Sequence, residues 1–303
     1  MNSNVQSDYK IRNPRLDEVP ELQNIWNHVF GNIGIDAFFL NFFNTEMCII
    51  AEYNNKPVAM GYLVPFGEII NGFDSISCMM TYSIATLPDH RGKGLGAAIV
   101  NKLIDTAFKN NLPVVLCPSD DSLFDYYNSR SGFIDWFYAN ECVYKNISPY
   151  SDPIIPVEIS IDEYISMREN LLNKVVHIKH DFQTLQYQVD LCGLLGGGLY
   201  KIGDACAVIE CQANGAVWIK ELLIKHLLKT ENKSDFPVSD PALINEIIAS
   251  IAYLFPAEEY LIRYPSYLNT GRRFGMIKHP VDLCESDLNS GNGFAPWYGM
   301  AFD

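Results

Sequence analysis

The stretch from Tyr82 to Ala97, YSIATLPDHRGKGLGA, constrains the fold of this chain more than any other. It reads as the end of a strand, a turn, and a glycine-rich loop that opens a helix, with Arg91, Gly94 and Gly96 in the spacing R-x-x-G-x-G. Glycines at such a turn let successive backbone N–H groups converge on one point without obstruction by Cβ atoms. The helix N-terminus adds unpaired donors and a partial positive charge. The stretch therefore predicts a site for a phosphate or pyrophosphate.

The residues after the loop predict an amphipathic helix that packs on a sheet. Its apolar residues recur at helical spacing on one side, and its polar residues face away. The apolar set is Leu95, Ile99, Val100, Leu103, Ile104, Ala107 and Phe108.

The loop has two other interpretations, a dinucleotide-binding loop and a turn that binds no ligand. Gly92, Gly94 and Ala97 also satisfy the dinucleotide pattern G-x-G-x-x-A, which expects the first strand of a βαβ unit just before the loop. Here the loop follows several strand-like runs, and Asn71-Gly72 between two of them is a hairpin signal. We therefore expect an antiparallel meander before the loop. The third interpretation is a strand–helix turn with no ligand.

The fuller stretch from Thr86 to Gly96, TLPDHRGKGLG, resembles the acyl-CoA loop of the GCN5-related N-acetyltransferase (GNAT) superfamily. In that family the loop amides hold the CoA pyrophosphate, and the open edge of the preceding strand pairs with the pantetheine arm. The resemblance implies acetyl-CoA as cosubstrate and no metal. It assigns cofactor binding to Ile84, Ala85, Thr86, Arg91, Gly92, Lys93, Gly94, Leu95, Gly96, Ala97 and Ser119.

Composition bounds the class of protein. At 303 residues, with 48% hydrophobic and 19% charged residues, the chain is long enough for two domains with sizeable cores. No run approaches the length of a membrane helix, and the start lacks an apolar signal region, so we expect a cytoplasmic protein. The eight cysteines are scattered without C-x-x-C pairs, which favours buried free thiols over a zinc site.

The charge and the resemblance together define the expected partners. A net charge of −14 argues against nucleic-acid binding, which requires a basic face. We expect a small-molecule amine as partner, no nucleic acid and no membrane. A homo-oligomer stays open.

The chain repeats one order of elements. Residues 147–156, ISPYSDPIIP, hold three prolines and predict a linker between a domain at 1–146 and one at 157–303. Both halves run strand, two helices, hairpin strands, helix, strand, but the second reads KHLLKTENKSDFPVSD where its phosphate loop would lie. The predicted fold is α/β of the α+β type. It comprises tandem GNAT-like domains, each a mixed, mainly antiparallel sheet flanked by helices, with a degenerate second domain.

This tandem resembles the two-domain part of the "enhanced intracellular survival" type of acetyltransferase, without its third, sterol-carrier-like domain. In that group the C-terminal carboxylate is thought to reach the active site, which implies a catalytic role for Asp303. The chain ends in APWYGMAFD, and these apolar residues predict an ordered tail.

The resemblance also implies an acid. The polar run from Ser119 to Ser122 predicts the N-terminus of a helix that Gly132 ends. LCPS at 116–119, followed by DYY at 125–127 and Gly132-Phe133, is similar to the family pattern in which a tyrosine before Gly-Phe protonates the leaving thiolate. Tyr127 is the candidate, but it lies one residue farther from Phe133 than the family usually has it, so Tyr126 and Asn128 stay open. No general base stands out among Glu46, Glu52, Glu68, His28 and His90.

The leading hypothesis is an N-acetyltransferase that transfers acetyl from acetyl-CoA to a primary amine by direct attack. Such an enzyme binds the thioester, presents a deprotonated amine and protonates the departing thiolate. The alternative is a non-catalytic acyl-CoA-binding sensor or scaffold. The acid discriminates them, because a sensor needs no hydroxyl at the thioester.

Overall fold

The computed structural model describes residues 8–32, 34–147, 153–225, 241–268, 270–281 and 293–302. The chain divides into two compact units, one comprising residues 1–67, 76–135 and 275–284, the other residues 68–75, 136–274 and 285–303. The predicted domain boundaries at 146 and 157 stay a prediction, and residues 148–152 of the predicted linker lie outside the described ranges. The predicted mixed, mainly antiparallel α/β class is confirmed. Its parallel pairings include β4 with β5 and β11 with β12.

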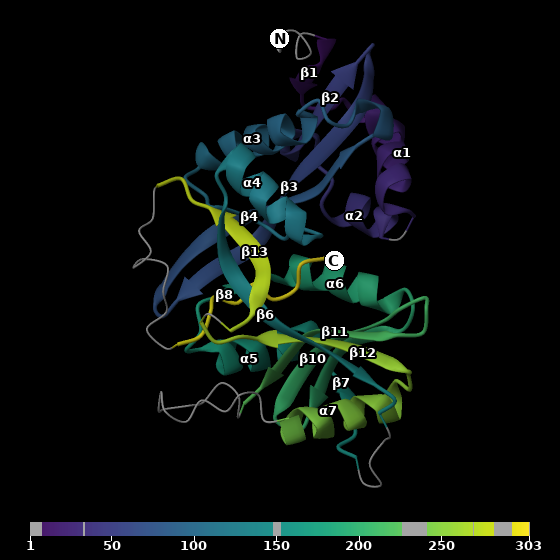
Figure 1. Ribbon diagram of the computed structural model, residues 1–303, viewed down its shortest axis with the longest axis vertical. Coiled ribbons are helices and arrows are strands. Elements are labelled where there is room, and N and C mark those ends of the chain that lie inside the picture. Colours follow the sequence, from purple (N-terminus) through teal and green to yellow (C-terminus); the bar gives the residue numbers. More distant parts are fainter. Residues whose placement is uncertain are drawn as a thin grey trace. The chain divides into compact units, whose positions relative to one another are not determined.

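The first unit is built on a meander with helices on both sides (Figure 1). Its strands follow the order β1-β2-β3-β4-β5-β13, and its helices α1 and α2 lie on the opposite side of the meander from α3 and α4. The elements are β1 Lys10–Arg12, α1 Val19–Phe30, α2 Ile35–Asn41, β2 Cys48–Tyr53, β3 Lys56–Asn71, β4 Asp74–Thr86, α3 Leu95–Phe108, β5 Val114–Leu116 and α4 Asp121–Ser131, with short 3-10 turns at Leu16–Glu18, Thr45–Met47 and Pro88–His90.

The two faces of the meander carry different side chains, because successive residues of a strand point to opposite faces. The predicted stripe of α3 is buried against one face, together with Ile49, Leu63 and Met79. The other face carries Tyr62 and Tyr82, whose rings contact an aromatic cluster from α1 and α2. That cluster consists of Trp26, Phe38 and Phe39, with Phe43 stacked on Phe39.

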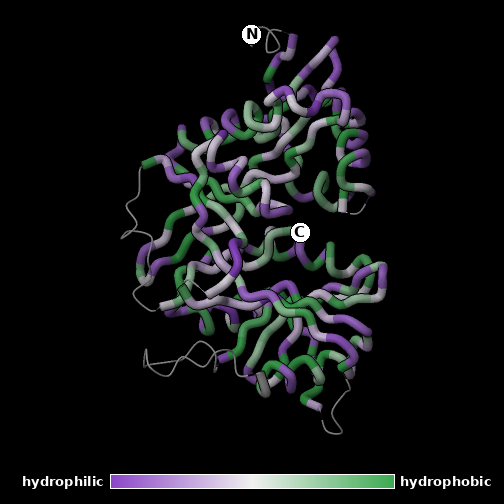
Figure 2. Tube along the Cα trace, in the orientation of Figure 1, coloured by the Kyte–Doolittle hydropathy of each residue, from purple (hydrophilic) through white to green (hydrophobic). Residues whose placement is uncertain are grey.

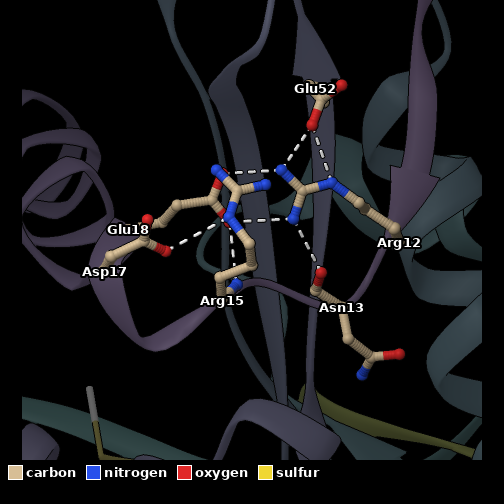
Figure 3. A network of polar contacts seen from close by, with 6 residues as sticks. All are labelled: Arg12, Asn13, Arg15, Asp17, Glu18 and Glu52. Atoms are coloured by element: carbon tan, nitrogen blue, oxygen red, sulfur yellow. Dashed lines mark hydrogen bonds and ion pairs between the residues drawn. The ribbon is translucent and has the colours of Figure 1, made fainter.

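An ion-pair network fastens β1 to β2 (Figure 3). The Arg12 guanidinium donates to Glu52 Oε2 from Nε at 2.7 Å and to Glu18 Oε2 from Nη1 at 2.8 Å. Arg15 adds a second cation at 2.8 Å from Glu18. The hydrogen bond from Arg12 is the main reason that the pKa of Glu18 is lowered. The side chains of Arg12, Glu18 and Glu52 are largely shielded from solvent. Because of this shielding, the network holds the short strand β1 in a defined register with β2.

The second unit has strands in the order β6-β12-β11-β10-β9-β7, with α5 and α6 packed against β9 and β10. Helix α7 buries its isoleucines against β10, β11 and β12. The α7 sequence, PALINEIIASIAYL, is mostly apolar, with Asn245, Glu246 and Ser250 among its few polar residues, and hydrophobic stretches also run along the neighbouring strands (Figure 2). The elements are β6 Ile134–Lys145, β7 Val157–Glu158, α5 Ile161–Leu172, β8 His177–Lys179, α6 Phe182–Gly193, β9 Gly197–Ile202, β10 Ala205–Cys211, β11 Val217–Ile224, α7 Pro241–Leu254, β12 Glu259–Pro265 and β13 Arg272–Lys278.

Two strands were not predicted from the sequence. Strand β8 pairs with the end of β3, where Ile69 faces Ile178, and β13 contributes Met276 and Ile277 to the first unit beside β5. Strand β3 itself runs to Asn71, which lets its end pair with β8. Both surprises concern pairing between residues far apart in the sequence.

The C-terminal segment is an ordered part of the second unit, as its composition predicted. Residues 294–302 are almost wholly buried. The backbone of Trp297 accepts from Ile178 N at 3.0 Å and donates to Val176 O at 2.8 Å. Asp303 itself lies outside the described residues. No helix in the described ranges is long and apolar enough to cross a membrane.

Candidate cofactor-binding and active site

Strand β4 leaves part of its edge open. It pairs with β5 at Met79 and Met80, opposite Val114 and Val115, and then continues to Thr86, whereas β5 ends at Leu116. Beyond that point the recorded pairing of β4 with β5 stops. Residues 84–86 were predicted to pair with pantetheine. They come after the point where β4 and β5 separate, so the pairing with β5 does not use their backbone groups.

The same part of β4 contains an irregular residue. Ser83 has φ +50°, a conformation that non-glycine residues seldom adopt within a strand. Such a residue breaks the regular alternation and changes the direction of the neighbouring amide groups. Ile84, just after it, packs its side chain against the core of the first unit. Nothing in the sequence marked Ser83 as special, because serine has no particular preference for this conformation.

The glycine loop opens toward free space. Gly92 and Gly94 have φ +75° and +79°, and a Cβ atom added at either would meet nothing within 4 Å. Gly94 is the N-cap of α3, and the amide of Ala98 makes the first intrahelical bond, to Gly94 O at 3.1 Å. The amides of Leu95, Gly96 and Ala97 are therefore the unpaired donors of the first turn. This arrangement suits an anion held by backbone N–H groups.

The charged side chains of the loop turn toward the protein. Arg91 Nε donates to Thr86 O at 3.0 Å. Lys93 Nζ donates to Tyr9 OH at 2.8 Å and to Asp89 O at 3.1 Å. His90 Nδ1 lies 3.0 Å from the same Tyr9 hydroxyl. In this state the loop presents its backbone, and its cations stabilise its shape. Sequence analysis missed Tyr9, which lies far from the loop in the sequence.

Helix α4 begins and ends as predicted. Asp120 caps its N-terminus by accepting from Ser122 N at 2.9 Å, and Gly132 ends it with φ +68°. Ser119, which the resemblance assigned to the cofactor, is an exposed residue just before the cap. Asn128 Nδ2 donates to Phe133 O at 2.8 Å, so this amide is engaged at the C-terminal end of the helix.

The two tyrosines of α4 have different surroundings. Tyr127 packs against the core of the first unit and contacts the Phe133 ring edge-on. Burial, together with the nearby Tyr126 and Asp120, raises the pKa of Tyr127 to about 12. The Tyr126 hydroxyl lies 3.4 Å from the position that a Cβ atom of Gly96 would occupy, and the Ile84 side chain lies 3.9 Å from the same position. The Tyr126 hydroxyl therefore lies beside Gly96, at the start of α3.

The candidate bases are mostly engaged elsewhere. Glu52 belongs to the Arg12 network, and His28 Nδ1 lies 2.8 Å from Asn24 O on the surface of α1. Within the described ranges, no group of three or more His, Cys, Asp or Glu side chains is arranged to hold a metal ion. The described cysteines are free thiols, four of them buried.

Residues 16–133 match the model of the acetyltransferase (GNAT) family. This segment is a GNAT domain. It includes the meander, the glycine loop, α3 and α4, and the predicted resemblance is thereby confirmed. This match supports acyltransferase chemistry, and the use of acetyl-CoA is general in the family. No curated protein matches the sequence significantly.

Solved structures with the same fold extend the likeness beyond the GNAT domain. A probable N-acyltransferase from Enterococcus faecalis has a TM-score of 0.63 at 10% identity, over 93% of this chain and 74% of that one. A GCN5-related N-acetyltransferase from Kribbella flavida has a TM-score of 0.61 at 10% identity, over 90% and 71%. Eis1 from Mycobacterium abscessus has a TM-score of 0.56 at 10% identity, over 90% and 73%. At these identities the likeness is one of fold.

Proposed function

We propose that this protein is an acetyl-CoA-dependent N-acetyltransferase that acts on a small primary amine. One observation carries the proposal. The unpaired amides of the α3 N-terminus and the open edge of β4 lie at the two ends of one short segment, residues 84–97. A ligand with a diphosphate joined to an extended amide-containing arm matches this pair of sites. Acetyl-CoA is such a ligand, and its thioester supplies the acetyl group.

The fit is supported by the space and the donors present. A Cβ atom added at Gly92 or Gly94 would meet nothing within 4 Å, and three amides of the first turn lack helical partners. The backbone of residues 84–86 offers the hydrogen bonds of an unpaired strand to the pantetheine arm. The distorted backbone at Ser83 directs a neighbouring amide out of the regular ladder, where it can polarise the acyl carbonyl as the amine attacks.

A hydroxyl of α4 would protonate the departing thiolate. Tyr127 is the acid predicted from sequence, and Tyr126 competes with it. The position of the Tyr126 hydroxyl beside Gly96 and Ile84 supports Tyr126, and the raised pKa of Tyr127 makes that phenol a weaker proton donor. The base is not assigned, and a catalytic role for the Asp303 carboxylate stays a proposal.

A thermal-shift and thiol-release experiment tests the function. CoA or acetyl-CoA should raise the melting temperature, because it binds the native state only, and NAD or NADP should not. Acetyl-CoA with a panel of primary amines should then release free thiol at a rate that depends on the amine. Stabilisation by CoA without thiol release for any amine would favour the sensor. Stabilisation by NAD alone would overturn both acyl-CoA hypotheses, the enzyme and the sensor, and would favour the dinucleotide interpretation of the loop.

A further inference from the structure

We propose that Tyr9 is a positioning residue for the cofactor loop, which keeps the loop in its ligand-ready shape before the ligand arrives. The inference rests on the proposed function, because it concerns the loop that is argued to bind CoA. Tyr9 lies just before β1, far from the loop in the sequence, yet it contacts two loop side chains through one atom.

The Tyr9 hydroxyl is shared by two partners. An ammonium group can only donate, so the Tyr9 oxygen accepts from Lys93 Nζ at 2.8 Å. The phenolic proton is then available to His90 Nδ1 at 3.0 Å, which accepts it when the ring carries its own proton on Nε2. Lys93 Nζ also lies 5.4 Å from the centre of the Tyr9 ring, within the range of a cation–π interaction. Removing this one oxygen atom would therefore take a hydrogen bond from each of the side chains of His90 and Lys93, which lie on either side of Gly92.

The sheet, rather than the loop, fixes the place of Tyr9. Its ring stacks on Tyr53 of β2 at 5.0 Å between centroids, and His90 packs edge-on against Tyr9 at 5.8 Å. The next residue, Lys10, pairs with Glu52, and the Arg12 network holds this pairing (Figure 3). Tyr9 is thus a fixed point to which the loop is attached.

A loop with three glycines has many accessible conformations, and ordering it on binding costs affinity. Attachment at Tyr9 restricts that freedom before binding. It also engages the Lys93 ammonium with Tyr9 and Asp89, so that the backbone amides of Leu95 to Ala97 define the anion site. On this account, Lys93 contributes to CoA binding mainly through Tyr9.

A double-mutant cycle tests the proposal. Tyr9→Phe keeps the ring and its stacking, so the sheet should survive. Calorimetry should show CoA binding weakened by about tenfold, the worth of one or two lost hydrogen bonds. Lys93→Met should weaken it by a similar factor, and the double variant should bind no worse than Tyr9→Phe. For acetyl-CoA turnover, KM should rise more than kcat falls. Tyr53→Phe, whose hydroxyl takes no part in these contacts, should bind CoA like the wild type.

Hydrogen exchange in the ligand-free protein gives a readout that does not depend on CoA. The amides of 91–96 should exchange faster in Tyr9→Phe than in Tyr53→Phe. Unchanged exchange, or losses of affinity that add in the double variant, would overturn the role of Tyr9, since additive losses mean that Lys93 contacts the ligand directly. A wild-type protein that does not bind CoA would instead refute the proposed function. The hydrogen-exchange result would still test the role of Tyr9, because it is measured without ligand.

Discussion

The two units contain the same strand arrangement and use it differently. In the first, β4 and β5 pair in parallel through Met80 and then separate. In the second, β11 and β12 pair in parallel through Ile219, and β11 continues to Ile224. Each longer strand is irregular just beyond the pairing. Ser83 has a positive φ, and Lys220 is skipped in the register of β11 with β10.

The difference lies in what meets the longer strand after this irregularity. In the first unit, β4 leads to the glycine loop, where a Cβ atom added at Gly92 or Gly94 would meet nothing within 4 Å. In the second, the carboxylate of Glu221 binds the chain's own C-terminal segment. Its Oε1 accepts from Trp297 Nε1 at 2.6 Å and from Arg168 Nη2 at 3.1 Å, and its Oε2 accepts from Tyr164.

The tail is closely fitted at this point. Gly299 has φ +81°, and a Cβ atom there would lie 2.6 Å from Arg168 Nη2 and from His180 Nε2. Only glycine fits at this position, because the backbone has a positive φ and lies close to the buried side chains of Arg168 and Glu221. The second unit thus places its own C-terminal segment against β11, whereas we propose that β4 and its glycine loop bind a ligand. We therefore expect only the first unit to bind CoA.

The largest expected effect comes from blocking the glycine loop of the first unit. Gly96 has a helical φ, and a Cβ atom there is tolerated at 3.4 Å from the Tyr126 hydroxyl. Gly96→Glu should therefore fold, but its carboxylate would meet the diphosphate, and calorimetry should detect no CoA binding. Gly96→Ala is the control, and it should retain most of the affinity. The wild type should bind one CoA per chain. Residual binding in Gly96→Glu, or two equivalents in the wild type, would place a second site elsewhere and contradict the comparison.

The next effect concerns the acid. Because the Tyr126 hydroxyl lies beside Gly96 and Ile84, Tyr126→Phe should lower kcat by about 10²–10⁴-fold, the usual contribution of a positioned acid. The Kd of acetyl-CoA should change little, because the lost contact matters mainly in the transition state. Tyr127→Phe is the matched control. If Tyr127→Phe carries the loss instead, the assignment from sequence is right. If neither variant is slower, α4 supplies no acid.

Much of the first unit was predictable, because its signals are local. The glycines, the stripe of α3, Asn71-Gly72 and the Gly132 stop each act within a few residues, and all appear where predicted. The site was only partly predictable. Tyr9 reaches the loop through the pairing of β1 with β2, and the Ser83 conformation follows from the whole sheet. Neither leaves a pattern in a single sequence.

The buried network of the second unit illustrates the same limit. Arg168 and Glu221 look like ordinary surface residues of an amphipathic helix and a strand, yet they are 1% and 0% exposed. Residues 226–240, where the second phosphate loop was predicted to be lacking, lie outside the described ranges. The sequence therefore indicated the resemblance between the units through the order of their elements. The difference between them lies in contacts that only the folded chain shows.

A smaller effect should follow from breaking the ion pair that holds the tail. Glu221→Gln leaves Arg168 buried without its counter-charge, which should cost about 3–5 kcal/mol in the free energy of unfolding. Glu259→Gln is the control, because it removes an exposed partner of Lys145 and should cost under about 1 kcal/mol. Urea unfolding at neutral pH measures both. Equal losses would mean that the Arg168–Glu221 pair is not a special feature of the second unit.

The same carboxylate should make the second unit sensitive to acid. Burial opposes ionisation, but the charge of Arg168 and the hydrogen bonds from Arg168 and Tyr164 outweigh it and lower the pKa of Glu221. A carboxyl whose pKa is lower in the folded state stabilises the protein above its unfolded pKa, and this stability is lost as the pH falls through the folded value. The difference in stability between wild type and Glu221→Gln should therefore shrink on acidification below about pH 4.

The smallest expected effect comes from removing the hydrogen bond between the C-terminal segment and Glu221. Trp297→Phe keeps an aromatic ring beside Phe274 but removes the Nε1 donor to Glu221. Hydrogen bonds to charged groups contribute about 1.5–3 kcal/mol, so the loss should fall below that of Glu221→Gln. In the double variant the losses should not add, because Glu221→Gln already removes the charge that strengthens the bond from Trp297 Nε1. Additive losses would mean that Trp297 stabilises the unit by packing alone. The tail would then not be held by Glu221, and the contrast between a strand that binds a ligand and a strand that binds the chain's own end would lose its physical basis.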